Sequence, residues 1–102
     1  MISADSIRDS FLRSVSVNYD WHCSQHFVDI SVSWHDGKSR SFRIVGLSDY
    51  NISEDFRAMY VEQCTLTIEA DRVYLSLDPY LEGTESERDN FTFTGTEILA
   101  MS

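Results

Sequence analysis

The sequence has little proline, glycine, cysteine or positive charge. Its 102 residues include one proline, four glycines and two cysteines, and eight lysines and arginines stand against 17 aspartates and glutamates. The net charge of −9 would repel phosphate groups, which argues against direct binding of nucleic acid or of an anionic membrane surface. Two cysteines, Cys23 and Cys64, are too few for a disulfide scaffold. The chain also lacks a signal-peptide pattern and an apolar run of membrane-spanning length. We therefore expect a cytoplasmic protein with free thiols.

The scarcity of glycine also bears on catalysis. The four glycines form neither a G-x-S-x-G elbow nor a glycine-rich phosphate cradle. Glu85 with Glu87, or Asp78 with Glu82, are formal candidates for a catalytic carboxylate pair. Such a pair needs surroundings that give its two members different proton affinities, and the polar segment around them predicts solvated side chains instead. We expect a protein that is not an enzyme and that uses no cofactor.

What the chain does contain is enough apolar material for one core. Hydrophobic residues make up 42% of the sequence and aromatic residues 13%, which is too much for a disordered acidic tail. A chain of 102 residues supports a single core but leaves no room for a second domain. We expect one domain that covers residues 1–102.

The N-terminal segment has a helical apolar spacing. Ile7 and Phe11 stand four positions apart, and Ser3 or Asp5 is available as an N-cap. This pattern predicts a short amphipathic helix over residues 4–13.

From residue 15 the apolar period changes to two, which is typical of half-buried strands. The strand pattern continues on both sides of a turn at residues 35–37. A three-residue loop there pairs Ile30 with Phe42 and Val28 with Ile44, and it keeps the apolar residues on one face. A two-residue loop would shift the register by one residue and place apolar and polar side chains on the same face of the hairpin. The three-residue loop places Gly37 in the left-handed conformation that glycine tolerates best.

The second half of the chain predicts further strands. Ser53 can cap a short helix near residues 53–59. A four-residue turn at residues 69–72 pairs Leu66 with Leu75, with the polar side chains on the other face. The chain then closes with a last strand that begins at residue 90. The fold class is therefore α+β and mainly β: a single antiparallel sheet or small sandwich of about six strands, with the N-terminal amphipathic helix and the short helix near residues 53–59.

Histidines and cysteines raise the question of a metal site. His22, Cys23 and His26 lie within five residues, and His35 and Cys64 lie elsewhere. Zinc needs three or four such side chains at one point, and no second pair with C-x2-C spacing accompanies the first group. We expect loop histidines and unligated thiols, and no metal site. The sequence assigns no role to His22, Cys23 and His26 beyond loop structure.

An acidic segment at residues 77–90 has no apolar periodicity. It carries five carboxylates against the single cation of Arg88. Numbered as a calcium loop, it places Asp78 at position 1, Glu82 at position 5 and Asp89 at position 12. Strand patterns on both sides do not fit an EF-hand, which needs helices. A looser calcium- or ligand-binding loop in a β-domain stays open as an alternative.

The negative charge belongs to the second half of the chain. Residues 1–49 carry six acidic and five basic side chains, whereas residues 50–102 carry eleven and three, so the net charges are −1 and −8. Dispersed carboxylates around an exposed aromatic residue favour rapid association with a basic protein. We expect these residues to contact such a partner: Asp78, Tyr80, Glu82, Glu85, Glu87 and Asp89.

The expected function is therefore that of a small acidic inhibitor that occupies a basic surface of another protein. Nucleases and other nucleic-acid-handling proteins have such surfaces, because their substrate is negatively charged. Bacterial toxin-immunity proteins and phage anti-defence proteins share this chemistry. The alternatives are the ligand-binding β-domain and an accessory subunit of a larger assembly. An open sheet edge would also allow homodimerisation by strand addition.

Overall fold

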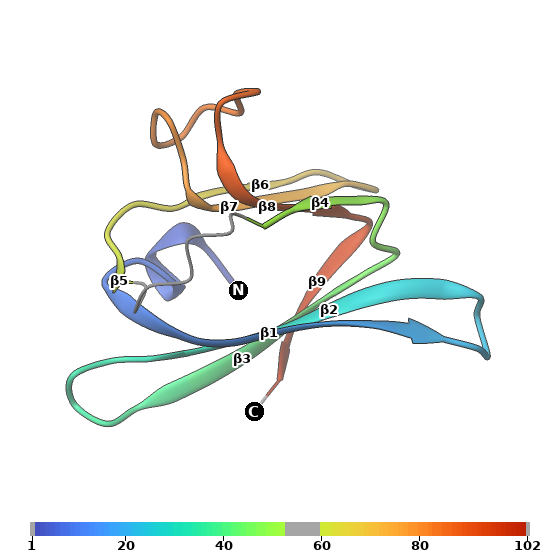
Figure 1. Cartoon of the computed structure of the whole chain (residues 1–102), viewed down its shortest axis with the longest axis horizontal. Helices are drawn as coiled ribbons and strands as arrows, with labels where there is room; N and C mark the ends of the chain where they lie inside the picture. Colours follow the sequence, from blue (N-terminus) through green and yellow to red (C-terminus); the bar gives the residue numbers. More distant parts are fainter. Residues whose placement is uncertain (1, 53–59, 102) are drawn as a thin grey trace.

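The protein is a sandwich of two antiparallel sheets (Figure 1). The computed structural model describes residues 2–52 and 60–101. The first sheet has the strand order β5-β1-β2-β3-β9 and consists of β1 (Ser10–Asp20), β2 (Gln25–Ser33), β3 (Ser39–Val45), β5 (Tyr60–Val61) and β9 (Glu97–Met101). The second sheet has the order β4-β8-β7-β6 and consists of β4 (Asp49–Asn51), β6 (Thr65–Ile68), β7 (Val73–Asp78) and β8 (Asn90–Gly95). The mainly β class is thus confirmed.

The core lies between the two sheets, because alternate residues of each strand point inward. The first sheet contributes apolar side chains from β2 and β3, and the second sheet contributes them from β7 and β8. The fully buried members include Val28, Ile30, Val32, Phe42, Ile44, Leu75, Leu77, Phe91 and Phe93.

The β2–β3 hairpin has the register that the sequence predicts. Ile30 lies opposite Phe42, and Val28 lies opposite Ile44. Gly37 has a φ angle of 85°, the left-handed conformation that the three-residue loop requires. The prediction of this hairpin is therefore confirmed.

The β6–β7 hairpin is confirmed as well. Leu66 pairs with Leu75, and the Glu69 amide donates a hydrogen bond of 2.8 Å to the Arg72 carbonyl across the four-residue turn. Leu75 is fully buried, whereas Leu66 is only partly buried against the core.

The predicted N-terminal helix is wrong. Only a single turn of 3-10 helix, η1 (Ala4–Ser6), forms there, and β1 begins at Ser10. The Asp9 amide donates to the Val61 carbonyl at 2.7 Å, and Asp9 itself has a φ angle of 63°. Pairing with β5 and burial of Ile7 thus override a weak helical preference in a segment rich in serine and aspartate.

The predicted last strand is divided into two strands, β8 and β9, which belong to different sheets. With the short strands β4 and β5, this division gives nine strands where about six were predicted. The division comes after Gly95, where the chain passes from the second sheet to the first. A Cβ atom on Gly95 would lie 2.5 Å from Ile44 Cγ2 and 2.6 Å from the Val45 carbonyl oxygen. Only glycine allows this close crossing. The short helix predicted near residues 53–59 lies outside the described residues.

Among the helices of the described residues, none is long and apolar enough to cross a membrane.

Candidate functional site

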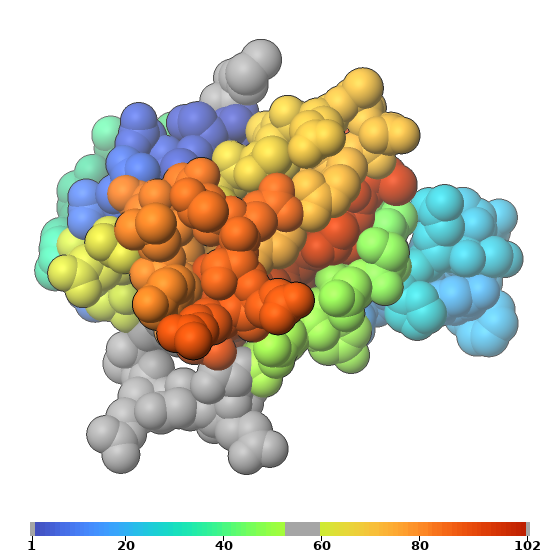
Figure 2. All heavy atoms as spheres, turned by 90° about the horizontal axis from the view of Figure 1, so that it is seen from above, coloured from blue at the N-terminus to red at the C-terminus, as the bar shows by residue number. Residues whose placement is uncertain are grey.

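The acidic loop, residues 79–89, joins β7 to β8 and stands on the outer face of the second sheet (Figures 1 and 2). The outward-facing side chains of Thr65, Tyr74 and Ser76 are buried, although the sequence predicts a polar outer face. The Gly83 amide donates to Thr65 Oγ1 at 3.0 Å. Gly83 has a φ angle of 87° in a turn that the Thr84 amide closes on the Leu81 carbonyl at 3.1 Å. The loop is therefore a folded cap on the sheet.

Asp89 organises the loop from below. Asp89 is only 3% exposed, and its carboxylate accepts three hydrogen bonds. The donors are the Tyr74 hydroxyl at 2.5 Å, the Tyr80 amide at 2.8 Å and the Ser86 amide at 2.9 Å. Burial alone would raise the pKa of Asp89, but these donors outweigh it and hold the pKa below its ordinary value. Burial and the hydrogen bond to Asp89 raise the pKa of Tyr74.

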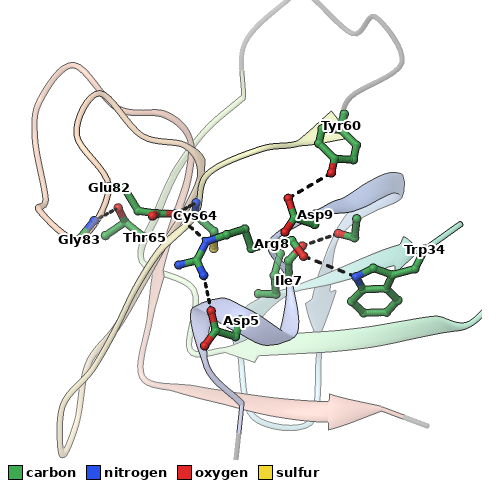
Figure 3. Close-up of polar contacts among 11 residues, drawn as sticks. Asp5, Ile7, Arg8, Asp9, Trp34, Tyr60, Cys64, Thr65, Glu82 and Gly83 are labelled. Carbon is green, nitrogen blue, oxygen red and sulfur yellow. Dashed lines mark hydrogen bonds and ion pairs between the residues drawn. The ribbon is translucent and has the colours of Figure 1, made fainter.

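Glu82 fastens the loop to the N-terminal turn (Figure 3). Its Oε2 atom accepts hydrogen bonds from the Cys64 amide at 2.8 Å and from Arg8 Nε at 2.9 Å. Arg8 also forms an ion pair with Asp5. The Cys64 amide and the Arg8 guanidinium lower the pKa of Glu82. Residues that are far apart in the sequence are thus joined by one carboxylate.

Glu85 fastens the same loop to the β6–β7 turn. The Arg72 guanidinium donates to both Glu85 oxygens, at 3.0 and 2.5 Å, and it lies 5.7 Å from the centre of the Tyr74 ring. The hydrogen bonds from Arg72 lower the pKa of Glu85. This two-point contact fixes the orientation of the carboxylate.

The other predicted residues of the loop region face solvent. Tyr80 is 63% exposed and its neighbour Leu81 is 60% exposed. The Arg88 guanidinium lies 5.2 Å from the centre of the Tyr80 ring. Asp78 and Glu87 are exposed, and Asp78 accepts a hydrogen bond of 3.3 Å from the Asn90 amide group. Three of the six predicted residues therefore build the loop, and three lie on its accessible surface.

Sequence reasoning missed Arg8, Arg72 and Leu81. Arg8 and Arg72 hold loop carboxylates from other elements, and no local pattern connects Arg8 to Glu82, which lies 74 positions away. Leu81 could have been found from the sequence. It stands beside Tyr80 in a polar segment without apolar periodicity, which indicates an exposed apolar side chain and not a core residue.

The histidines and cysteines that raised the question of a metal site lie in separate parts of the fold. His22, Cys23 and His26 lie at the free end of the β1–β2 hairpin, whereas His35 lies in the turn at the opposite end of the first sheet (Figure 1). Cys64 is buried in the core, where burial raises its pKa to about 12. Within residues 2–52 and 60–101, no three histidine, cysteine, aspartate or glutamate side chains are placed to hold a metal ion together.

The calcium alternative would place Asp78, Glu82 and Asp89 around one ion. Glu82 and Asp89 instead accept hydrogen bonds from two separate sets of donors.

A second exposed surface lies at the end of the β1–β2 hairpin, which projects beyond the second sheet in both views (Figures 1 and 2). Trp21 is 83% exposed. The Tyr19 ring lies edge-on to Trp21, with centroids 4.8 Å apart, and to His26, with centroids 4.9 Å apart. Asp20 shapes the turn by accepting the His22 amide at 2.9 Å.

The sequence matches no protein-family model and no curated protein, and the structure matches no solved structure. A functional proposal therefore depends on the geometry and charge of these surfaces.

Proposed function

We propose that the protein is a non-enzymatic inhibitor of another protein, and that its acidic loop binds a basic surface of that partner. The observation that carries the proposal is the exposure of two large apolar side chains, Tyr80 and Leu81, on a loop that hydrogen bonds hold against the second sheet. Apolar surface that stays in contact with water does not stabilise the protein. An aromatic side chain that is buried in a pocket of a partner, in contrast, can supply a large part of the free energy of binding.

The internal contacts of the loop support this proposal. Asp89, Glu82 and Glu85 each tie the loop to a different part of the fold. A loop that is already ordered loses little conformational entropy on binding, so more of the contact energy appears as affinity. The loop carboxylates thus act mainly by preorganising the surface that carries Tyr80 and Leu81.

Charge supports a basic partner. Asp78 and Glu87 stay exposed beside the apolar pair, and the second half of the chain carries a net charge of −8. A negative surface of this kind speeds the approach of a positive one and repels nucleic acid. The partner class that fits is a nucleic-acid-handling enzyme with a basic groove, as in toxin-immunity or phage anti-defence pairs in the cytoplasm.

The test compares three proteins as bait in a lysate of the native host: the wild type, the double variant Tyr80→Ala/Leu81→Ala, and Trp21→Ala. Trp21 is the control, because it is an even more exposed aromatic residue and lies at the end of the β1–β2 hairpin, away from the acidic loop. We expect the wild type and Trp21→Ala to capture the same basic protein and the double variant to lose it. Dissociation of the purified pair should then be at least about tenfold faster for the double variant. Capture that depends on Trp21 and not on the loop would contradict the proposal.

A further inference from the structure

The longest free strand edge in the described part of the chain belongs to β1. β1 has 11 residues, and β5 pairs with only two of them, Ser10 and Phe11, which leaves nine, residues 12–20. No other described strand lies on this side of β1. The edge strands β9, β6, β4 and β5 have five, four, three and two residues. A free edge is a template for another strand, because it presents unpaired amide and carbonyl groups, and β1 offers the longest such template.

Only the start of this edge carries a feature that protects strand edges. Soluble proteins protect their edges with bulges, lysines, prolines or inward-pointing charges. β1 has a bulge between Leu12 and Ser14. Residues 14–20 then pair with β2 in continuous register, and they contain no lysine or proline and a single charged residue, Asp20. The hairpin that contains them projects beyond the second sheet (Figure 1). This stretch of the edge is therefore open to pairing.

The two faces of residues 14–20 differ in chemistry. Val15 and Val17 lie opposite fully buried residues of β2, so they point inward, and both are only partly buried themselves. Tyr19 lies on the same face by alternation and is 38% exposed. The outward side chains are all polar: Ser14, Ser16, Asn18 and Asp20. A strand that pairs here thus meets an apolar row on one face and a polar row on the other.

We propose that β1 pairs in antiparallel orientation with β1 of a second copy of this chain, with the two-fold axis at Val17. Opposite residues of an antiparallel ladder point to the same face, so the axis between two identical strands must pass through a residue. An axis at Val17 uses all of residues 14–20. An axis one residue earlier or later uses only residues 14–18 or 16–20 before one strand reaches the bulge or the β1–β2 turn.

The register with its axis at Val17 is self-complementary on both faces, as a two-fold interface must be. On the inner face Val17 lies opposite its counterpart and Val15 lies opposite Tyr19, and pairs of aromatic and β-branched residues stabilise sheets. The outer face pairs only polar side chains: Ser16 with Asn18, and Ser14 with Asp20.

Charge favours a second copy over a charged partner at this edge. Residues 1–49, which contain β1, have a net charge of only −1. The Asp20 residues of the two copies would lie at opposite ends of the ladder, about 20 Å apart. That separation exceeds the screening length of about 8 Å at physiological salt. The edge therefore neither attracts a strongly charged strand nor repels its own copy.

The pairing goes beyond the proposed function and is independent of it, because the acidic loop belongs to the second sheet and β1 to the first. We would measure sedimentation velocity over a dilution series of the purified full chain. The wild type should form a dimer whose fraction rises with concentration. Ile68→Lys is the control, because Ile68 is exposed on β6, an edge strand of the second sheet. It should leave the dimer unchanged.

Two double variants test the register. In Ser16→Lys/Asn18→Lys each lysine lies opposite a lysine of the other copy, so the dissociation constant should rise at least about tenfold, although the added lysines reduce the net negative charge. In Ser16→Lys/Asn18→Glu opposite charges face each other, and the dimer should be at least as tight as that of the wild type. Both variants remove the hydrogen bonds of the Asn18 amide to the Ser16 carbonyl and hydroxyl, at 3.2 and 3.0 Å, so they differ only in the charge at residue 18.

Cross-linking locates the axis even if a double variant fails to fold. Opposite residues of an antiparallel pair have Cα atoms about 4.5 to 5.5 Å apart, which suits a disulfide. In a Cys23→Ser background, which removes the exposed thiol, Val17→Cys should form a disulfide between copies and Val15→Cys should not. A wild type that stays monomeric at every concentration overturns the proposal. A dimer that is equally tight in both double variants overturns it as well, and so does one in which Val17→Cys cross-links no better than Val15→Cys.

Discussion

Asp89 shows how one buried side chain decides the shape of a surface. Its carboxylate receives one hydroxyl and two backbone amides, and it lies at the base of a loop whose other charges face outward or sideways. A buried carboxylate is stable only when donors replace its lost water, and here the donors come from β7 and from the loop itself. Asp89, one of the six residues that the sequence predicts to bind a partner, is therefore a structural residue of the loop.

Replacing Asp89 should cost more than removing one of its partners. Asp89→Ala leaves the Tyr74 hydroxyl and two amides without their acceptor, and we expect a loss of about 2 to 4 kcal/mol in the free energy of unfolding. Tyr74→Phe removes a single donor and should cost about 1 kcal/mol. Urea unfolding at neutral pH measures both. Equal losses in the two variants would show that the amides do not depend on Asp89.

The loop as an element is held by three carboxylates whose pKa values are all lowered, which makes its stability dependent on pH. The folded state lowers the pKa of Asp89 from 3.8, and those of Glu82 and Glu85 from 4.5. In acid the folded protein thus binds fewer protons than the unfolded chain. The stabilisation is therefore complete above these ordinary values and is lost as the pH falls through the lower folded values.

We expect urea unfolding to show a steep loss of stability between about pH 5 and pH 3. Asp89→Asn should make the free energy of unfolding depend less steeply on pH, because the asparagine amide does not titrate. The control Glu87→Gln changes an exposed loop carboxylate and should leave the steepness as it is. Identical pH profiles for the wild type and Asp89→Asn would show that Asp89 does not contribute to the pH dependence of stability.

Elements whose contacts are local could be predicted from the sequence. The two hairpins have alternating apolar residues and turns of defined length, so pairs such as Ile30 with Phe42 follow from adjacent segments. The N-terminal segment could not be predicted in this way, because its conformation depends on β5, about 50 residues later. The loop is a similar case: the charge of Glu82 is visible in the sequence, but its pairing with Arg8 is a product of the whole fold.

At the scale of the whole molecule, the −9 charge should control how fast a basic partner arrives. Electrostatically steered association falls as salt shortens the screening length, whereas dissociation depends mainly on the contacts made. Glu82 and Glu85 are unsuitable for a charge-reversal test, because Arg8, Cys64 and Arg72 hold them in the fold. Asp78 and Glu87 are exposed and suit the test better.

The double variant Asp78→Lys/Glu87→Lys should associate with the captured partner at least about tenfold more slowly at low salt, and its rate should vary less with salt than that of the wild type. The control for local effects is Asp49→Lys, which reverses an exposed charge opposite Thr94, at the end of β8 far from the loop. It should lower the rate only slightly. Stopped-flow association over a salt series measures all three proteins. Equal rates for the double variant and the wild type would mean that the partner is not steered by this loop, and that its charge serves only to hold the cap and keep the protein in solution.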